Sequence, residues 1–480
     1  MKKPNLLFIF TDQQRADTMS CYGNDQIETP AMNALADESF VFENAYVSQP
    51  VCSPSRATLL TGLYPHSSGV PSCNVPLPAE TPTIAELISE DYRCAYMGKW
   101  HLGDEIFPQH GFGEWVGTED TYRRGYSTEE NLSELSPYHH HLLENGFTPD
   151  VEIMGQRVFS RHAGASLDEP FTKAAFLGDR AGAFIREKRD EPFVLFVNYL
   201  EPHPPHTSPL NYLYDPWSLP TGPAFMQRPP ANAPLLNRLM AAFYMESEDY
   251  GCDLRSEEGW RRLQARYWGN VTLVDRSVDK ILRALDESGQ ADETIVVFTS
   301  DHGEQMGDHS ILGKTLMYEE SVKVPLLLRV PAFGRQMKKI EGNISHIDLL
   351  PTLLELMGEP VPGDLQGESR LSVLEGNDTL VGNDVFIEWN GSDGHHPRSI
   401  GEAEVNRSMA QPLRTVVTAE RWKLNLYESG PGELYDLNID PHEMENLYDR
   451  AEHQARVLDL AGRIARWQKR TGDQVSLPSL

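Results

Sequence analysis

Four short apolar runs of this chain each lead directly into residues that could do chemistry. The polar residues that follow these runs are Asp12 and Gln13, Lys99 and His101, His203, and Asp301 and His302. A single aspartate in such a place is more often a helix cap or a turn former. Because four such ends would share one rim of a sheet, we expect two carboxylates, an amide oxygen and an imidazole to converge on one divalent cation, through Asp12, Gln13, Asp301 and His302.

The other members of this group carry positive charge or a transferable proton. They are Lys99, His101, His203 and Lys314, the last of them in "LGK". Mostly oxygen ligands favour calcium, magnesium or manganese, and the single imidazole tilts the choice slightly toward manganese. A metal ion with two lysines and two histidines suits a tetrahedral oxyanion, because it can polarise the anion, balance developing charge and protonate a leaving oxygen.

A further candidate is the cysteine in "VCSPSRATLLTG". Ser53 suits a helix N-cap, Pro54 the first helical position and Gly62 the position after the helix. Cys52 would then lie at a helix N-terminus, where backbone N–H groups and the dipole favour anions. Two interpretations remain open: a thiolate of lowered pKa, as in cysteine phosphatases, or an inert buried thiol with Arg56 facing solvent. The stretch alone favours the inert thiol.

The apolar runs predict the elements that must position these residues. They lack polar alternation, which is typical of strands buried on both faces of a parallel sheet, and they cover 5–10, 92–97, 192–200, 294–300 and 324–330. Helical patterns such as 274–285 lie between them. The alternation predicts an α/β/α sandwich on a large, mostly parallel sheet. In such sheets ligands bind outside the carboxyl ends of the strands, where the polar residues fall.

Changes in composition and in hydrophobic pattern divide the chain into two expected domains. We expect a catalytic α/β domain over 1–378, interrupted by insertions at about 118–170 and 203–258 that are rich in Pro, Tyr, His and acidic residues. From 379 to 480 short strands, turns and a final helix predict a smaller antiparallel lobe with one packed helix. The insertions are where we expect specificity loops.

Composition excludes several classes of partner. The chain has 480 residues and a formal net charge of −29, which argues against nucleic acid and against an anionic membrane surface. An anionic substrate would need a local cationic pocket. No apolar stretch approaches the roughly 18–20 residues of a membrane span. Five dispersed cysteines form no disulfide framework. As written, the chain is expected to be cytoplasmic, or exported if a leader was removed.

The stretch "CSPSRATLLTG" resembles the C-x-P-S-R-x-x-x-x-T-G signature of type I sulfatases, in the alkaline-phosphatase superfamily. It matches at every defined position, namely Cys52, Pro54, Ser55, Arg56, Thr61 and Gly62. Further stretches are similar to the same family in its order: "PNLLFIFTDQQRAD", "MGKWHLG", "EPHPPH", "TSDHGEQMGDH", "LGKTLMYEESVKVPLLLRVP" and "GELYDLNIDPHEMENL". The resemblance covers nearly the whole chain apart from the two insertions.

This resemblance implies that Cys52 does not act as a thiol. A separate maturing enzyme would oxidise it to formylglycine, whose hydrated aldehyde attacks sulfur. The implied metal ligands are Asp12, Gln13, Asp301, His302 and residue 52. Arg56 would steady the diol, His101 would be the base, Lys99 and Lys314 would hold sulfate oxygens, and His203 would protonate the leaving group. The expected cation is Ca²⁺ first, with Mn²⁺ or Mg²⁺ as alternatives.

The pairs Asp12-Gln13 and Asp301-His302 depart from the Asp-Asp and Asp-Asn of many family members. Such variation also occurs in the phosphonate monoester hydrolase branch. We therefore expect a metal-dependent sulfatase acting on a carbohydrate or aryl sulfate monoester, with a phosphonate monoester or phosphodiester hydrolase as the alternative. A non-catalytic binder of sulfated glycans is a third hypothesis, which the lysines and histidines and the negative charge disfavour.

Two other histidine clusters are weaker candidates. "HHH" at 139–141 is expected to be a solvated surface run rather than a metal site. The segment 395–398, "HHPR", is expected to be either a plain loop or a contact to substrate that reaches over the site from the second lobe.

Overall fold

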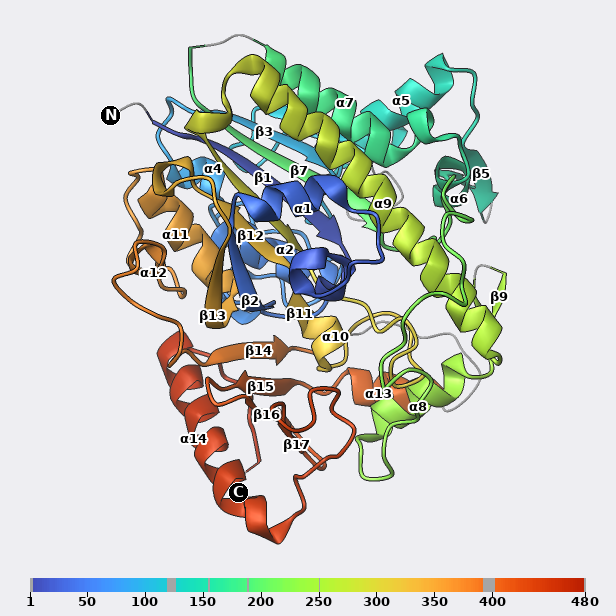
Figure 1. Ribbon diagram of the computed structural model, residues 1–480, viewed down its shortest axis with the longest axis vertical. Coiled ribbons are helices and arrows are strands. Elements are labelled where there is room, and N and C mark those ends of the chain that lie inside the picture. Colours follow the sequence, from blue (N-terminus) through green and yellow to red (C-terminus); the bar gives the residue numbers. More distant parts are fainter. Residues whose placement is uncertain are drawn as a thin grey trace.

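The computed structural model describes residues 3–118, 127–153, 156–187, 190–249, 251–391 and 402–478. It is an α/β/α sandwich with a smaller lobe packed below it (Figure 1). The segment 395–398 lies outside the described residues. None of the helices within the described ranges is both long and apolar enough to cross a membrane.

A nine-stranded sheet forms the centre of the larger domain. Its path is β11-β2-β12-β10-β1-β7-β3-β4, and β13 pairs with β2. The strands are β1 (Asn5–Asp12), β2 (Phe40–Tyr46), β3 (Arg93–Gly98), β4 (Glu114–Gly117), β7 (Phe193–Pro202), β10 (Thr294–Ser300), β11 (Lys323–Val324), β12 (Leu326–Arg329) and β13 (Lys338–Ser345). Neighbours β10, β1, β7, β3 and β4 run parallel, whereas β12 and β11 are antiparallel to their partners. The predicted mostly parallel sheet is therefore confirmed.

Strand β1 shows why its sequence lacks alternation. All eight of its residues are buried. Leu6, Phe8 and Phe10 contribute to one hydrophobic cluster, and Leu7 and Ile9 to the cluster on the opposite face. A strand covered on both faces must be apolar at every position.

Two layers of helices cover these faces. One cluster includes α1 (Pro30–Asp37), α7 (Lys173–Arg186) and the long α9 (Glu257–Ser288). The other includes α2 (Cys52–Thr61), α4 (Ile84–Leu87), α11 (Leu349–Leu356) and α12 (Leu371–Leu374). The short helices α3 (Pro65–Ser68) and α10 (Glu319–Val322) follow α2 and precede β11 respectively.

The smaller lobe contains a separate antiparallel sheet in the order β14-β15-β16-β17. Its elements are β14 (Val385–Trp389), β15 (Leu413–Val417), β16 (Trp422–Tyr427), β17 (Glu433–Asp436) and the helix α14 (Gln454–Thr471). Val457, Leu460 and Ile464 of α14 pack on Val416 and Leu424 of the sheet. The boundary expected after residue 378 falls between α12 and β14.

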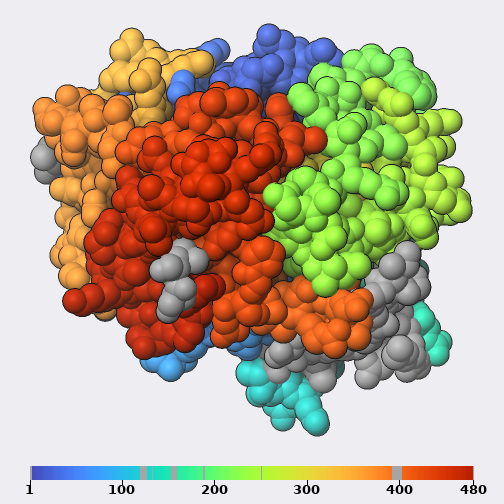
Figure 2. Space-filling model, turned by 90° about the horizontal axis from the view of Figure 1, so that it is seen from below, coloured from blue at the N-terminus to red at the C-terminus, as the bar shows by residue number. Residues whose placement is uncertain are grey.

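The two insertions carry short elements of their own. The first contains α5 (Pro137–Glu144), the hairpin of β5 (Asp150–Ile153) and β6 (Gln156–Phe159), and α6 (Arg161–Ala165). The second contains α8 (Leu235–Tyr244), β8 (Glu248–Asp249) and β9 (Cys252–Asp253). Helix α13 (Glu402–Met409) of the smaller lobe packs against α8. Figure 2 shows the second insertion beside this lobe on one face of the molecule.

The expected solvation of "HHH" is wrong for His139. This side chain is fully buried, and its Nε2 lies 3.1 Å from Oδ1 of Asp150 in the hairpin. His139 lies three residues before the buried Leu142 of α5, so both side chains are on the inward face of this helix.

His66 of α3 ties the larger domain to the smaller lobe. Its Nδ1 lies 2.6 Å from Oε2 of the buried Glu388 in β14, and its backbone N–H donates to Oε1 at 2.8 Å. Burial opposes protonation of His66, but the hydrogen bond and charge of Glu388 outweigh it and raise the pKa above the ordinary histidine value. A raised pKa gives stability that is present at low pH and lost as pH rises through the folded-state pKa.

We therefore expect His66→Gln to lower the free energy of unfolding by about 2 kcal/mol at about pH 5.5 and by clearly less at about pH 9. Urea denaturation at the two pH values measures this difference. His140→Gln on the exposed side of α5 is the control and should change little at either pH. Equal losses for His66→Gln at both pH values would contradict the ion pair.

Candidate active site

The order of the sheet brings the chemical residues together. Strands β10, β1, β7 and β3 are neighbours with their carboxyl ends at one edge. Backbone hydrogen bonds join the segments beyond these ends: Asp301 N donates to Thr11 O at 3.0 Å, and His203 N to Asp12 O at 3.1 Å. Lys99 N donates to Asn198 O at 3.3 Å. The sequence-predicted residues from four strand ends thus share one site.

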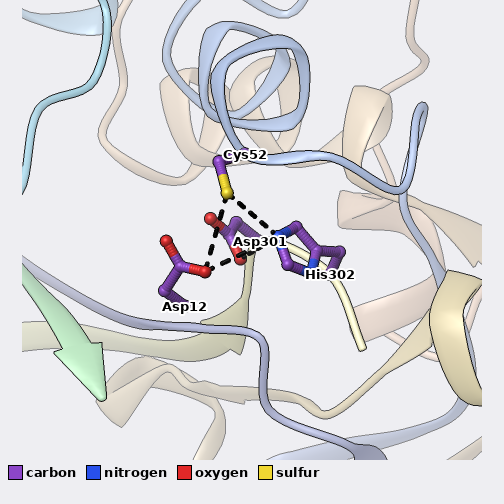
Figure 3. Close-up of side chains that lie close together, drawn as sticks. All are labelled: Asp12, Cys52, Asp301 and His302. Atoms are coloured by element: carbon purple, nitrogen blue, oxygen red, sulfur yellow. Dashed lines mark hydrogen bonds and ion pairs between the residues drawn. The ribbon is translucent and has the colours of Figure 1, made fainter. Parts of the chain in front are cut away.

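Four side chains point toward a common centre in Figure 3. Asp12, Cys52, Asp301 and His302 each offer one ligand atom, and these atoms all lie within 4.8 Å of one another. Nε2 of His302 lies 3.2 Å from Sγ of Cys52, 3.5 Å from Oδ1 of Asp12 and 3.4 Å from Oδ1 of Asp301. Sγ of Cys52 lies 3.7 Å from Oδ1 of Asp12. All four side chains are buried.

Helix α2 delivers Cys52 and begins earlier than expected. Its first residue is Cys52 and its N-cap is Val51, so the prediction of Ser53 as N-cap is wrong. The Ser53 hydroxyl instead accepts a hydrogen bond from Asn74 N at 3.1 Å, which fixes the 73–74 loop beside the helix. Gly62 ends the helix at φ 65°, as its predicted place after the helix requires.

Arg56 does not face solvent, so the interpretation of an inert thiol beside an exposed arginine is wrong. The side chain is fully buried, Nε donates to Oδ2 of Asp301 at 2.8 Å, and Nη2 donates to Oδ2 of Asp12 at 2.8 Å. Nη1 donates to the Lys99 carbonyl at 2.9 Å. One guanidinium therefore joins three strand ends, and it leaves Oδ1 of each carboxylate toward the centre.

Burial and neighbouring charges shift the pKa values of the two carboxylates in opposite directions. Burial and the neighbouring Cys52 raise the pKa of Asp12, but Lys99 and Arg56 outweigh them and hold it below its ordinary value. Lys99 Nζ donates to Asp12 Oδ2 at 2.7 Å. Burial and the charge of Asp12 raise the pKa of Asp301 to about 6, against the effect of Arg56.

The environment of Cys52 favours negative charge. A hydrogen bond with Cys73 and the ammonium groups of Lys314 and Lys99 outweigh burial and lower the pKa of the Cys52 thiol well below its ordinary value. Both lysines therefore lie close enough to residue 52 to act on a group held there. Arg56, Lys99 and Lys314 bring three positive charges to this site, and an anionic substrate would require such local positive charge in a chain of net charge −29.

The four converging atoms fit a divalent cation. Ligands at about 2.3–2.6 Å from one ion lie roughly 3.3–5 Å apart, and the separations of 3.2–3.7 Å lie close to the short end of this range. Nδ1 of His302 lies 3.0 Å from the Gly303 carbonyl, so an N–H there leaves Nε2 as the ligand atom. The donor set of these residues can hold such an ion.

Gln13 lies at the edge of this group with φ 71°. Its Oε1 accepts a hydrogen bond from Lys314 Nζ at 2.6 Å, and its Nε2 donates to Glu304. Its backbone N–H donates to Oδ1 of Asp301 at 3.1 Å. Gln13 therefore connects Lys314 to the metal-ligand group and is placed to orient both.

His101 lies between residue 52 and the 73–74 loop. Its Nε2 lies 2.8 Å from Oδ1 of Asn74, and the Cys52 side chain is close enough to act on the charge of the ring. Burial and the ammonium group of Lys99 lower the pKa of His101 to about 4, which makes it a neutral imidazole near pH 7. A neutral imidazole can accept a proton.

His203 and Lys314 border the site on the side of the second insertion. Burial and the ammonium group of Lys314 hold the pKa of His203 well below its ordinary value. Nδ1 of His203 lies 2.8 Å from the Pro204 carbonyl. With Nδ1 carrying the hydrogen, Nε2 is the nitrogen left to meet a substrate.

Three residues of the site were not predicted from the sequence. Asn74 contacts His101, Cys73 contacts Cys52, and Glu304 contacts Gln13. Asn74 and Cys73 stand in an irregular loop about twenty residues after Cys52, where no periodicity marks them. Glu304 carried a signal, because it follows Asp301 and His302 in "TSDHGEQ".

We expect Arg56→Lys to lower the free energy of unfolding by about 3 kcal/mol and to weaken calcium binding, because one ammonium cannot span both carboxylates. Denaturation in urea and isothermal titration of the converted enzyme with Ca²⁺ measure the two effects. Arg283→Lys is the control, since Arg283 forms an exposed pair with Asp279. Unchanged stability and calcium affinity in Arg56→Lys would show that the bridge is dispensable.

Protein-family models and a curated relative match this chain over most of its length. The model of the sulfatase family matches residues 4–359, and the model described as N-sulphoglucosamine sulphohydrolase, C-terminal, matches residues 307–470. The uncharacterized sulfatase YidJ of Escherichia coli (strain K12) is 33% identical over 472 residues, which cover 94% of this chain and 84% of that protein.

Solved structures share the fold over almost the whole chain. The structure of BT4656 in complex with its substrate D-glucosamine-2-N,6-O-disulfate has a TM-score of 0.78 at 23% identity and covers 98% of this chain and 99% of its own. The phosphonate monoester hydrolase of Agrobacterium radiobacter has a TM-score of 0.76 at 26% identity and covers 98% and 96%. Because the sulfatase model matches most of the chain and the alkaline-phosphatase-like fold agrees with it, this chain belongs to the sulfatase family.

Proposed function

We propose that this enzyme hydrolyses sulfate monoesters of a carbohydrate or aryl alcohol to the alcohol and inorganic sulfate, with a formylglycine formed from Cys52. The observation that carries the proposal is the convergence of Cys52 with Asp12, Asp301 and His302 at the N-terminus of α2. A sulfated small molecule or glycan is the substrate class, as for the neighbour whose substrate is D-glucosamine-2-N,6-O-disulfate. A formylglycine-generating enzyme is the implied partner.

A divalent cation, when bound, would polarise the oxygen of residue 52 and offset the charge of the substrate. We propose Asp12, Gln13, Asp301, His302 and residue 52 as its ligands. After conversion of Cys52 this set is oxygen-rich, so Ca²⁺ is the first choice and Mn²⁺ or Mg²⁺ the alternatives. Arg56 holds the two carboxylates in place and would hold the hydrated side chain of residue 52 beside them.

His101 is the proposed base. Asn74 fixes one ring nitrogen at 2.8 Å and the ring contacts the side chain of residue 52, so the imidazole is aimed at that residue. Its lowered pKa keeps it neutral and able to take a proton from a hydroxyl of residue 52 when sulfate is expelled.

Lys99 and Lys314 are the proposed anchors of the sulfate oxygens, and His203 is the proposed proton donor to the leaving alcohol. The proposal is supported by their contacts, since Lys99 Nζ donates to Asp12 Oδ2 at 2.7 Å and Lys314 Nζ donates to Gln13 Oε1 at 2.6 Å. His203 is neutral without substrate because burial and Lys314 lower its pKa. The negative charge of a bound sulfate ester would favour its protonation, so the acid forms where it is needed.

A phosphonate monoester or phosphodiester hydrolase is the alternative, favoured by the solved phosphonate monoester hydrolase that matches 98% of this chain. The same residues would serve it. The two hypotheses differ in the preferred substrate, and mature enzyme tests them directly.

We expect mature enzyme to show a higher kcat/KM for an aryl sulfate than for the matching aryl phosphonate monoester. Mass spectrometry of the peptide with residue 52 establishes that the thiol has become an aldehyde. Cys52→Ser should keep the fold and lose nearly all turnover of both substrates. Preference for the phosphonate would replace the sulfatase proposal by its alternative, and wild-type turnover in Cys52→Ser would remove residue 52 from the mechanism.

We expect Asn74→Gly to lower kcat about ten- to hundredfold with little change in KM, because His101 loses the acceptor that orients it. Glycine is the suitable replacement, since Asn74 has φ 63°. Thermal unfolding should be unchanged, and Asn377→Ala on the exposed surface is the control. A fall in stability that accounts for the lost activity would assign Asn74 a purely structural role.

A further inference from the structure

The cation site contains a sulfur atom in the chain as it stands before conversion. Its ligand atoms are Sγ of Cys52, Nε2 of His302 and one oxygen each of Asp12 and Asp301. Hard cations such as Ca²⁺ and Mg²⁺ select oxygen and do not take thiolate. Thiolate, imidazole and carboxylate are together the ligands that Zn²⁺ accepts.

The separations of these atoms match a tetrahedral zinc site. Ligands at about 2.0–2.3 Å from one tetrahedral Zn²⁺ lie roughly 3.3–3.8 Å from one another. Sulfur to imidazole nitrogen is 3.2 Å, and sulfur to Oδ1 of Asp12 is 3.7 Å. The imidazole nitrogen lies 3.5 Å from Oδ1 of Asp12 and 3.4 Å from Oδ1 of Asp301. Four of the six separations therefore lie close to the tetrahedral spacing, and all ligand atoms lie within 4.8 Å of one another.

Neighbouring groups hold these ligands in place. Arg56 binds Oδ2 of both carboxylates, so Oδ1 of each is turned to the centre. The Gly303 carbonyl fixes Nδ1 of His302 at 3.0 Å. The positive charges of Arg56 and Lys99 offset part of the charge of two carboxylates and a thiolate.

We propose that the unconverted chain binds Zn²⁺ at this site, with Cys52 as a thiolate ligand. We further propose that conversion of Cys52 to formylglycine makes the site selective for hard cations. Binding forms a Zn–S bond and releases the thiol proton to solvent. The bound sulfur is then shielded from reagents that attack a free thiol. The first half needs only the unmodified chain, and the second half rests on the proposed function.

The test uses full-length protein made in a host without the maturing enzyme, with an unmodified Cys52 verified by mass spectrometry. Cobalt(II) is the probe, because it takes tetrahedral zinc sites and gives a thiolate charge-transfer absorption. We expect this absorption in the unconverted chain, its loss on adding Zn²⁺, and no loss on adding excess Ca²⁺. Cys94→Ser, which removes a buried thiol of β3 that lies outside the ligand group, should behave as wild type.

Cys52→Ser should lose the absorption and bind zinc at least about 100-fold more weakly. In case that variant fails to fold, the unconverted wild-type chain gives a second measurement: Zn²⁺ should protect Cys52, but not Cys21, from iodoacetamide, as read by mass spectrometry. Mature enzyme should lack the absorption.

A cobalt spectrum without the thiolate band, persistence of the band in Cys52→Ser, or alkylation of Cys52 at an equal rate with and without zinc would each overturn the zinc site. These results would leave the sulfatase proposal untouched. Conversely, mature enzyme without sulfatase activity would sink that proposal and not the zinc site.

Discussion

The site depends above all on one buried guanidinium that bridges two parallel strands. Arg56 comes from α2, and its partners Asp12 and Asp301 end β1 and β10. Two buried carboxylates this close would repel each other, and burial would drive at least one to take up a proton. Arg56 makes their joint burial tolerable, and in doing so it fixes α2 and therefore Cys52 against the sheet.

The Arg56 bridge also gives the two oxygens of each carboxylate different partners. Oδ2 of Asp12 is occupied by Arg56 and Lys99, and Oδ2 of Asp301 by Arg56. What remains at the centre is one oxygen from each strand, the His302 nitrogen and the side chain of residue 52. The identity of the atom at residue 52, sulfur or oxygen, then decides whether the group as a whole is soft or hard.

Much of this arrangement follows from sequence. The unbroken apolar runs identified five regions of the central sheet, and the rule that ligands gather at the carboxyl ends of parallel strands placed residues from four of those ends in one site. Strand β13 escaped notice because "KKIEGNIS" alternates and lies half exposed, and β4 because it has only four residues. Asn74 and Cys73 escaped because their contacts depend on how a loop folds back on Ser53, which no local pattern encodes. His139 was misjudged since its buried partner, Asp150, comes from a separate hairpin.

The residues at the strand ends do not by themselves discriminate between sulfate monoesters and phosphonate monoesters. Both kinds of monoester are tetrahedral and carry one negative charge near neutral pH, so Lys99 and Lys314 attract either with similar strength. The difference is the carbon substituent that a phosphonate carries where a sulfate carries oxygen, and that group needs an apolar wall rather than a further cation. The strand ends supply lysine and histidine side chains. An apolar surface for the carbon substituent would have to come from segments that cover these strand ends. We therefore expect the selection to reside in the two insertions and the smaller lobe, where α8 and α13 pack together.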